Sequence, residues 1–482
     1  MLEQFGSDLG GKPALNWVQD GLIGEGRTIV GSRGARRLIY ADYVASGRAL
    51  RQVEAFMLEH VLPFYANTHS ESSYCGAYST QLRETARARI AALTGAGPEH
   101  AVIFAGAGAT AGFNRLVALL GVAAAAAAGE RPVVLTGPYE HHSNILPWRE
   151  SGAEVVEVPE AEAGGPDMDA LAALLHCYRD RSVKVGTFSA ASNVTGVKTD
   201  VAAVTAQLKA AGARVVWDFA CAAPYCPIDM SPAEGVEVDA VVFSAHKFVG
   251  GPGASGVLIV RRDAVRDARP SWPGGGTVRF VSPWAHDYLD DVEAREESGT
   301  PNVLGDIRAG LALTVKDMVG QQVIDAREHE LGDRALAAWD NHPALWLLGV
   351  EKKKRLPIFS FMVRHRAGGF VDPQLFTAAL SDRYGIQARG GCSCAGPYGH
   401  RLLGIDRELS DRLRAAVLAG DETAKPGWVR LNFSYVMTDE AADTVIAAVA
   451  ELAEDLWQQP AAADHGYVSY VRGEWIGQIS PR

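Results

Sequence analysis

The sequence has few cysteines, no excess of positive charge and no long apolar segment, and each shortage excludes a class of protein. Its six cysteines in 482 residues include no C-x-x-C pair, so we expect a reducing compartment rather than a disulfide framework. A net charge of −11 lacks the basic surface that binds phosphate backbones, which argues against a nucleic-acid partner. The most apolar long run, residues 116–128, is too short to span a bilayer, so no membrane partner is expected.

The first residues carry neither the basic nor the apolar region of a signal peptide, and we therefore expect a cytoplasmic protein. What is present is the composition of a globular protein, with 48% apolar and 21% charged residues. The length exceeds that of one ordinary domain. We expect a large domain over residues 40–320, a small C-terminal domain over 321–482, and an N-terminal extension over 1–39 that packs with the small domain.

Short apolar runs alternate with stretches of helical spacing across residues 100–260. The runs with the length and character of buried strands are 101–104, 132–135, 183–188, 215–217 and 241–243. This alternation predicts a mostly parallel sheet covered by helices on both faces. In such a sheet, side chains that follow the strands gather at one edge, where ligands bind.

Lys247 has an unusual position, directly after the buried run 241–243 and among Ser244, His246 and several glycines. Lysine is rarely buried without a partner, and burial lowers its pKa, which suits an amine that forms a Schiff base. A surface lysine on a flexible glycine turn is the alternative for this stretch alone.

Asp218 ends a second apolar run, residues 215–217, and decides between these alternatives. A lysine that forms an imine, and an acid that keeps a pyridine nitrogen protonated, are the two groups that pyridoxal phosphate (PLP) requires. Lys247 and Asp218 together therefore predict a PLP site.

Residues 106–112 form a glycine-rich turn between a strand and a helix. Free N–H groups and the helix dipole at such a position bind phosphate. The same residues match G-x-G-x-x-A, a dinucleotide fingerprint, so this stretch alone leaves a nicotinamide-dependent enzyme as the alternative. A dinucleotide fold has no use for Asp218 and Lys247, and we therefore assign the turn to the phosphate of PLP.

The pattern S-x-H-K with a glycine turn, preceded by D-x-A at Asp218, resembles the fold-type I PLP enzymes of the class V aminotransferase group. Within that group the chain most resembles the cysteine desulfurases and selenocysteine lyases, from about Tyr40 to Glu440. The resemblance implies an α/β fold, with a mostly parallel sheet of the seven-stranded type in the large domain and a smaller α+β domain. It also implies a homodimer.

The resemblance implies roles for residues in several loops. His141, in E-H-H-x-N-x-x-P-W, would stack on the PLP ring and act as an acid and base; a metal pair or an ordinary loop histidine is the alternative. Asn193, in S-N-V-x-G, would bond the phenolic oxygen of PLP and the substrate carboxylate, where an ordinary turn is the alternative. Thr300, in G-T-P-N, would reach the phosphate of a neighbouring subunit. The other implied cofactor contacts are Ala109, Thr110, Asp218, Ser244, His246 and Lys247.

The expected small domain contains R-x-G-x-x-C-A-x-P, which resembles the desulfurase signature at every fixed position and places the nucleophile at Cys394. Cysteine is most often a small buried hydrophobe, but a glycine-rich loop after an arginine would stabilise a thiolate. Cys392 lies two residues earlier, off the signature position. Arg430 matches the arginine that forks the substrate's α-carboxylate, with Arg389 beside it; a surface arginine on a strand is the alternative.

These motifs imply an enzyme in which Lys247 holds PLP and moves the α-proton of an amino acid. Cys394 would take sulfur from L-cysteine as a persulfide, with release of alanine. A sulfur-acceptor protein is an expected partner, and no metal is expected. The alternatives with the same fold are a C–S β-lyase, a selenocysteine lyase, an aminotransferase and an epimerase. A non-catalytic scaffold is disfavoured, because Lys247, Asp218, Cys394 and Arg430 are all present.

Overall fold

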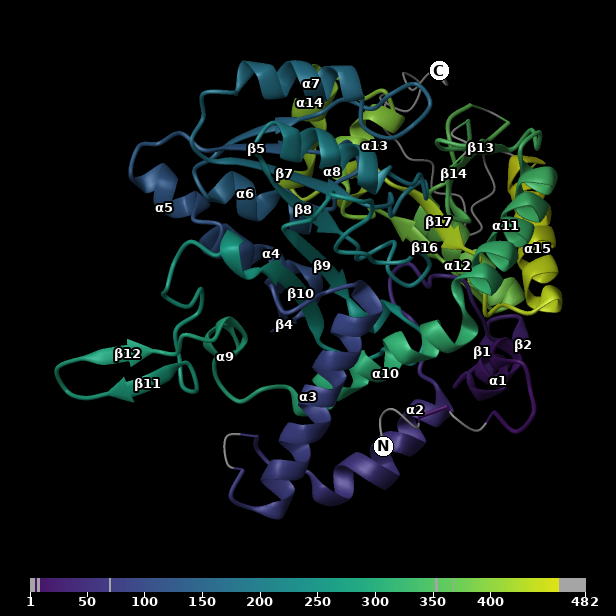
Figure 1. Ribbon diagram of the computed structural model, residues 1–482. Helices are drawn as coiled ribbons and strands as arrows, with labels where there is room; N and C mark the ends of the chain where they lie inside the picture. Colours follow the sequence, from purple (N-terminus) through teal and green to yellow (C-terminus); the bar gives the residue numbers. More distant parts are fainter. Residues whose placement is uncertain (1–4, 7–8, 69–70, 352–353, 367, 459–482) are drawn as a thin grey trace. The chain divides into compact units, whose positions relative to one another are not determined.

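The computed structural model describes residues 5–6, 9–68, 71–351, 354–366 and 368–458, which fall into two compact units (Figure 1). The first unit holds the described residues within 1–23, 46–191 and 199–321, and the second holds those within 24–45, 192–198 and 322–482. The expected N-terminal extension is therefore divided at residue 23, and the short segment 192–198 belongs to the second unit. Each unit has a sheet of its own.

A mostly parallel, seven-stranded sheet forms the centre of the first unit in the described part of the chain, which confirms the predicted fold class. In order across the sheet, its strands are β4 (His100–Gly106), β10 (Gly256–Arg261), β9 (Ala240–Ser244), β8 (Arg214–Asp218), β7 (Lys184–Ser189), β5 (Val133–Thr136) and β6 (Glu154–Glu157). β10 runs antiparallel to both of its neighbours, whereas the pairs from β9 to β6 are parallel. Every residue of β9 is buried, which explains its uninterrupted apolar run.

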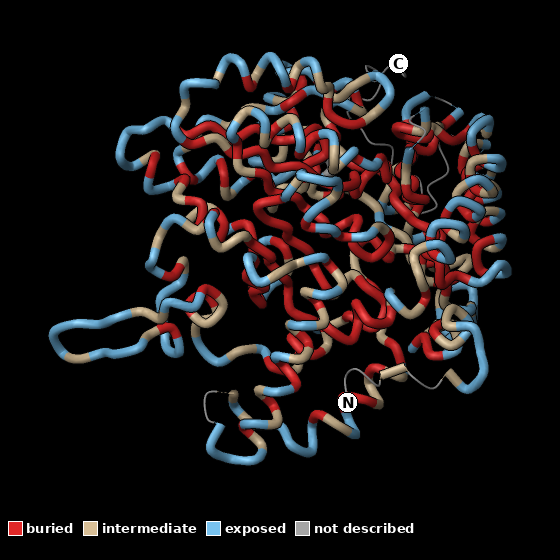
Figure 2. The backbone as a smooth tube through the Cα atoms, in the orientation of Figure 1, coloured by how far each residue is buried: buried red, intermediate tan, exposed pale blue. Residues whose placement is uncertain are grey.

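Helices of the first unit surround this sheet, and several of them pack on it. The α-helices of this unit are α1 (Ala14–Gly21), α2 (Arg51–Phe56), α3 (Tyr74–Thr94), α4 (Gly108–Leu119), α5 (Val122–Ala127), α6 (Leu146–Glu150), α7 (Met168–Cys177), α8 (Val201–Ala210), α9 (Val292–Glu296) and α10 (Val303–Val319). α4 contacts β4, β9 and β10 through a core that includes Ile103, Phe113 and Val242. Figure 2 shows that the buried backbone of the first unit follows its strands. This packing holds the start of α4 at the end of the neighbouring strands.

A two-stranded hairpin extends away from the rest of the first unit (Figure 1). It consists of β11 (Val278–Val281) and β12 (His286–Tyr288), which pair antiparallel. Large apolar side chains on it face solvent, because Trp284 is 90% exposed, Val281 62% and Phe280 57%. Trp272, just before the hairpin, is 66% exposed. Exposed apolar side chains gathered in this way mark a binding surface.

The second unit is built on a four-stranded antiparallel sheet. Its strands, in order, are β13 (Leu345–Leu347), β14 (Ile358–Val363), β17 (Trp428–Asn432) and β16 (Arg389–Gly391). Two small pairs accompany it: the antiparallel β1 (Thr28–Gly31) with β2 (Gly34–Arg37), and the parallel β3 (Ile39–Tyr40) with β15 (Ile386–Gln387). Its helices are α11 (Gln321–Trp339, whose first residue belongs to the first unit), α12 (Pro373–Tyr384), α13 (Gly396–Leu402), α14 (Arg407–Leu418) and α15 (Asp439–Gln458).

An aromatic cluster fixes α11 to the sheet of the second unit. Trp339 is fully buried, and its ring centroid lies 5.2 Å from that of Phe359 and 5.8 Å from that of Phe433. Such edge and tilted ring contacts add to the free energy gained by burial. Among the described residues of the whole chain, no helix is both long and apolar enough to cross a membrane.

Candidate active site

Parallel strands of the first unit end at one edge of the sheet, and the predicted cofactor residues follow those ends. β9 leads into the segment that carries Lys247, β8 ends at Asp218, and β5 leads toward His141. In the register of the sheet, Asp218 pairs with Val242 of β9 and with Ser189 of β7. The topology therefore gathers residues that are far apart in the sequence, as expected for a ligand site at the carboxyl ends of parallel strands.

Asp218 is a buried carboxylate, only 4% exposed, and its Oδ1 accepts a hydrogen bond of 2.8 Å from the N–H of Ala220. Burial raises the pKa of Asp218, while the Ala220 N–H and the positive charge of Lys247 act in the opposite direction. The structure thus brings the Lys247 ammonium close enough to favour the ionised form of Asp218. A buried carboxylate at a ligand edge is suited to a cationic partner.

Lys247 ends a short turn that follows β9 and is half-buried. Ser244, the last residue of β9, accepts a hydrogen bond of 2.9 Å at its Oγ from the N–H of Ala109 in the first turn of α4. His246 is half-buried, and its backbone oxygen accepts a 3.0 Å bond from the N–H of Gly47. The first contact joins the lysine segment to the start of α4, and the second joins it to Gly47.

The glycine-rich start of α4 approaches the lysine segment closely. Gly108 has a φ of +60°, and a Cβ there would lie 3.2 Å from Ser244 Oγ and 3.3 Å from the His246 ring. A side chain at this position would therefore crowd the start of the helix, where free N–H groups favour negative charge. Thr110, in the first turn of α4, is exposed, and its Oγ1 lies 2.6 Å from Ser143 Oγ, with either hydroxyl able to donate.

His141 is half-buried and belongs to the same group of side chains. Its Nδ1 accepts a 3.1 Å hydrogen bond from the N–H of Ser143 and lies 3.0 Å from the Ser143 hydroxyl. The ring of His142 is 6.1 Å away, centroid to centroid, and tilted by 46°. Within the described ranges, no group of three or more His, Cys, Asp or Glu side chains is placed to hold a metal ion. Ser143 therefore links His141 to Thr110.

Glu140 is a site residue to which the sequence analysis assigned no role of its own. It is 3% exposed, and both of its oxygens accept bonds from Ser189, from the N–H at 2.7 Å and from Oγ at 2.8 Å. Asn144 also donates to it. Burial, helped by the negative charge of Asp218, raises the pKa of Glu140 to about 8. An acidic residue shortly after a buried strand, and next to His141, was the available signal.

The predicted substrate arginines lie in the second unit. Arg430 is 2% exposed, and its Nη2 donates a 2.7 Å bond to Asp42 Oδ1 while Nη1 donates a 3.2 Å bond to the backbone oxygen of Asn193. In the described part of the chain its Nε has no hydrogen-bond partner. Arg389 is exposed and pairs directly with Arg430 across β16 and β17, so both side chains lie on one face of the sheet.

Asn193 is buried in the second unit and is hydrogen-bonded both to Arg430 and to the loop that carries Cys394. Its Nδ2 donates a 2.8 Å hydrogen bond to the backbone oxygen of Ser393, next to Cys394. Among the described residues, its Oδ1 has no hydrogen-bond partner. Asn193 therefore anchors the cysteine loop and still presents an unused acceptor.

Cys394 lies in the loop between β16 and α13 and is half-buried. Its φ is +55°; among the described residues that are not glycine, it shares a positive φ with Arg131 alone. Residues other than glycine adopt this left-handed conformation at an energetic cost, and such strain is common at functional sites. Cys392 is exposed, and its Sγ lies 3.4 Å from the backbone nitrogen of Cys394. No disulfide joins any of the six cysteines, all of which lie in the described ranges.

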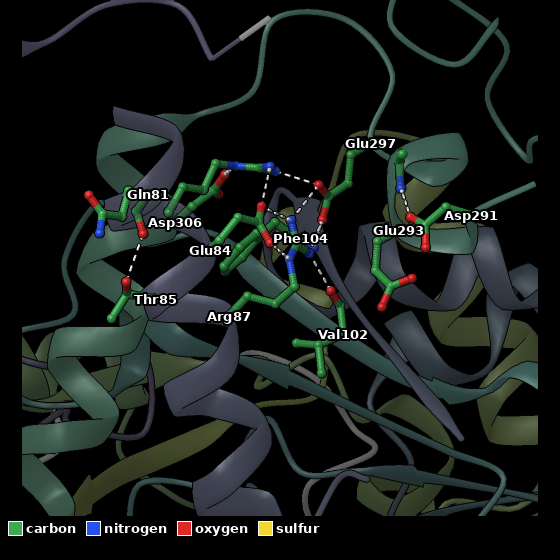
Figure 3. Close-up of polar contacts among 12 residues, drawn as sticks. Gln81, Glu84, Thr85, Arg87, Val102, Phe104, Asp291, Glu293, Glu297 and Asp306 are labelled. Carbon is green, nitrogen blue, oxygen red and sulfur yellow. Dashed lines mark hydrogen bonds and ion pairs between the residues drawn. The ribbon is translucent and has the colours of Figure 1, made fainter. Parts of the chain in front are cut away.

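Thr300 is exposed and follows a segment that is fixed by buried ion pairs (Figure 3). Glu297 accepts a 2.7 Å bond from Arg87 Nη1 and a 2.7 Å bond from the N–H of Phe104, and it also pairs with Arg83. Phe104 belongs to β4, which leads to the phosphate turn. Glu297, three residues before Thr300, is thus hydrogen-bonded to β4, the strand that precedes α4.

The aminotransferase class V family model matches residues 39–444 of the chain. A cysteine desulfurase from Enterobacter sp. (strain 638) is 32% identical over 367 residues, which cover 75% of this chain and 85% of that protein. A probable cysteine desulfurase from Streptomyces coelicolor is 29% identical over 368 residues, covering 75% of this chain and 84% of that protein.

Solved structures also resemble the chain. The apo structure of a cysteine desulfurase from Thermococcus onnurineus NA1 superposes with a TM-score of 0.70 and 25% identity, covering 87% of this chain and 95% of that one. A cysteine desulfurase from Escherichia coli, in its S-sulfonic acid form, gives a TM-score of 0.67 and 25% identity, covering 86% of this chain and 95% of that one.

Proposed function

Because the chain belongs to the class V aminotransferase family, a family of PLP-dependent enzymes, we propose that it is a cysteine desulfurase that takes sulfur from L-cysteine and releases alanine. The observation that carries this proposal is the buried Asp218 carboxylate beside Lys247, at the ends of adjacent strands. The signature around Cys394 and the desulfurase relatives support the same activity.

The residues of the first unit fit PLP. Lys247 would hold the cofactor aldehyde, Asp218 would pair with the pyridine nitrogen, and the turn before α4 would bind the phosphate through Ala109, Thr110, Ser244 and His246. A Cβ at Gly108 would crowd this turn, which agrees with its use as a phosphate cradle. When bound, PLP supplies an electron sink that weakens the bonds at the α-carbon of an amino acid.

Two side chains of the first unit would handle protons at this site. Lys247 would move the α-proton of the substrate through its ε-amine, and His141 would stack on the cofactor ring and act as an acid and base. His141 Nδ1 already accepts the bond from the Ser143 N–H, which holds the orientation of the imidazole ring.

Cys394 would perform the sulfur step. Its thiolate attacks the substrate sulfur, an S–S bond forms while the C–S bond breaks, and the carbon fragment takes up a proton and leaves as alanine. The enzyme thiol and cysteine thus give one persulfide and one alanine, so no external oxidant is needed. The left-handed backbone at Cys394 and the bond from Asn193 to Ser393 support a loop held in one conformation for this attack.

The substrate carboxylate would bind Arg430, with Arg389 and Asn193 beside it. Asp42 already accepts one bond from Arg430, so the incoming carboxylate has to compete with it or use the Nε edge of the guanidinium. A planar guanidinium can donate hydrogen bonds to both carboxylates at once, whereas the single ammonium of a lysine lacks this fixed arrangement of donors.

We further propose a cytoplasmic homodimer that passes sulfur to an acceptor protein. Thr300 is exposed on a segment fixed by Glu297, which suits contact with the phosphate of a neighbouring subunit. The apolar hairpin β11–β12 offers a surface that a second copy could bury.

Product analysis with the purified enzyme and a panel of sulfur and selenium amino acids tests the activity. We expect alanine from L-cysteine, together with a persulfide on Cys394. The variant Cys394→Ser should keep the visible absorption band of bound PLP, because Lys247 and Asp218 are unchanged, but it should form no persulfide. Sulfide and pyruvate released at the wild-type rate by Cys394→Ser would instead identify a β-lyase.

A further inference from the structure

The loop that carries Cys394 holds a second thiol whose position is defined by the backbone. The N–H of Cys394 points at Cys392 Sγ, with the nitrogen and sulfur 3.4 Å apart. Backbone N–H groups are donors that an ionised acceptor uses more strongly than a neutral one. The sulfur of Cys392 therefore lies against the residue that bears the other thiol.

Ser393, between the two cysteines, is buried and held by a hydrogen bond. It is 1% exposed, and its backbone oxygen accepts the 2.8 Å bond from Asn193 Nδ2. Asn193 is itself held by Arg430, which donates to its backbone oxygen. The middle of the loop is thus anchored to the substrate-binding group, and the two thiols flank this anchor.

The two thiols differ in exposure. Cys392 is exposed, whereas Cys394 is half-buried and has the left-handed backbone. Sulfur taken up at a half-buried residue is poorly reachable for another macromolecule. A thiolate that is exposed and next to it can accept that sulfur and present it to solvent, because thiolate exchange depends on access as well as on nucleophilicity.

We propose that Cys392 is a second catalytic thiol that receives the sulfur from Cys394 and passes it to the acceptor; this rests on the proposed desulfurase activity. The Cys392 thiolate attacks the outer sulfur of the Cys394 persulfide. A new S–S bond forms at Cys392, the old one breaks, and its electron pair remains on Cys394 as a thiolate. The persulfide proton stays with the transferred sulfur, and no oxidant or reductant is consumed.

Peptide mapping during a single turnover tests the relay. The holoenzyme receives less than one equivalent of L-cysteine, is alkylated with iodoacetamide at successive times, and is digested. Fragment ions then place the trapped persulfide on residue 392 or 394. In the wild type, the adduct should appear first on Cys394 and then on Cys392. In Cys392→Ser it should stay on Cys394, and its transfer to added glutathione should slow by about tenfold or more.

Cys177→Ser is the matched control, because Cys177 is also exposed but lies in α7, away from this loop. It should show the wild-type time course. An adduct confined to Cys394 at all times in the wild type would overturn the relay. So would a disulfide between Cys392 and Cys394 with release of sulfide, because Cys392 would then have attacked the inner sulfur.

Failure of the proposed function can be told apart from failure of the relay. If L-cysteine places sulfur on neither residue, the desulfurase activity is wrong. The apoprotein is then treated with one equivalent of inorganic polysulfide, desalted and alkylated at successive times. A relay requires the sulfur that polysulfide places on Cys394 to decline as that on Cys392 grows in the wild type, and to remain on Cys394 in Cys392→Ser. Equal, unchanging adducts on both residues would overturn it.

Discussion

At the scale of single residues, the cofactor edge of the first unit contains two buried acids that differ in their neighbours. Asp218 lies beside the positive charge of Lys247, whereas Glu140 receives donors from Ser189 and Asn144 and faces the negative charge of Asp218. Two adjacent carboxyl groups in a buried site do not both ionise readily. Glu140, whose pKa is raised to about 8, therefore keeps its proton near neutral pH, while burial also raises the pKa of Asp218 against the opposing charge of Lys247.

The variant Glu140→Gln should remove a pH dependence of stability. The ordinary pKa of the carboxyl, 4.5, is raised to about 8 by burial first and by Asp218 second. Between these values the native protein keeps a proton that the unfolded chain has released. Its free energy of unfolding therefore falls as pH rises from about 5 to about 8, by on the order of 1.4 kcal/mol per pH unit. The amide of the Glu140→Gln variant cannot titrate, so the variant should lack this slope.

Urea unfolding at several pH values, followed by tryptophan fluorescence, measures this effect. Glu150→Gln is the control, because Glu150 is exposed at the end of α6 and should leave the wild-type slope intact. Equal slopes in wild type and Glu140→Gln would mean that Glu140 is ionised in the native protein.

At the scale of elements, a buried ion network holds α3, α9, α10 and β4 together (Figure 3). Arg83 and Arg87 come from α3, Asp306 from α10, and Glu297 from the residue after α9. Burial alone would raise the pKa of Glu297, but the charges of Arg87 and Arg83 outweigh it and hold that pKa below its ordinary value. The network therefore fixes the segment that leads to Thr300.

The variant Glu297→Ala should lower the free energy of unfolding by about 3–5 kcal/mol, because it leaves two buried guanidinium groups without their shared partner. Glu84→Ala is a matched control: Glu84 pairs with Arg87 at 2.9 Å, but its side chain is 50% exposed. Exposed pairs contribute about 1 kcal/mol or less. Similar losses in both variants, measured by denaturant unfolding, would contradict a special role for Glu297.

At the scale of the whole molecule, the hairpin β11–β12 of the first unit exposes large apolar side chains to solvent, and contact with a partner would bury them. Its side chains Trp284, Phe280 and Val281 are exposed despite being large and apolar. Dimerisation through this surface would remove that area from water, which is favourable by roughly 25 cal/mol per Å². If the proposed dimer forms through this hairpin, replacing the apolar side chains of the hairpin should weaken the dimer.

The double variant Phe280→Ser, Trp284→Ser should weaken dimerisation by at least about tenfold, as measured by sedimentation equilibrium over a range of concentrations. The control is Leu418→Ser, because Leu418 is 71% exposed at the end of α14 in the second unit. If the hairpin variant and the control form dimers as tightly as the wild type, the hairpin does not belong to the interface.

Local patterns were sufficient for much of this molecule. Continuous apolar runs revealed the strands buried on both faces, and the residues just after them located Asp218 and Lys247, because adjacent parallel strands end together. Contacts between distant segments were not predictable in this way. Arg430 pairs with Asp42, 388 residues away in the sequence, and Ser189 at the end of β7 donates to Glu140, 49 residues away. Neither contact has a periodic or spacing signal, since each depends on tertiary packing.

The division of the chain between its two units also affects how it is made. All seven strands of the first unit's sheet have been synthesised by Arg261, whereas Ile39 pairs with Ile386 in the second unit. At about 5–20 residues per second, a ribosome takes roughly 20–70 s to produce that partner. Strand β3, Ile39–Tyr40, therefore lacks its partner strand during this time, whereas β1 and β2 can already pair with each other. During this interval β3 is open to chaperones, and ribosome pausing before residue 386 would lengthen it.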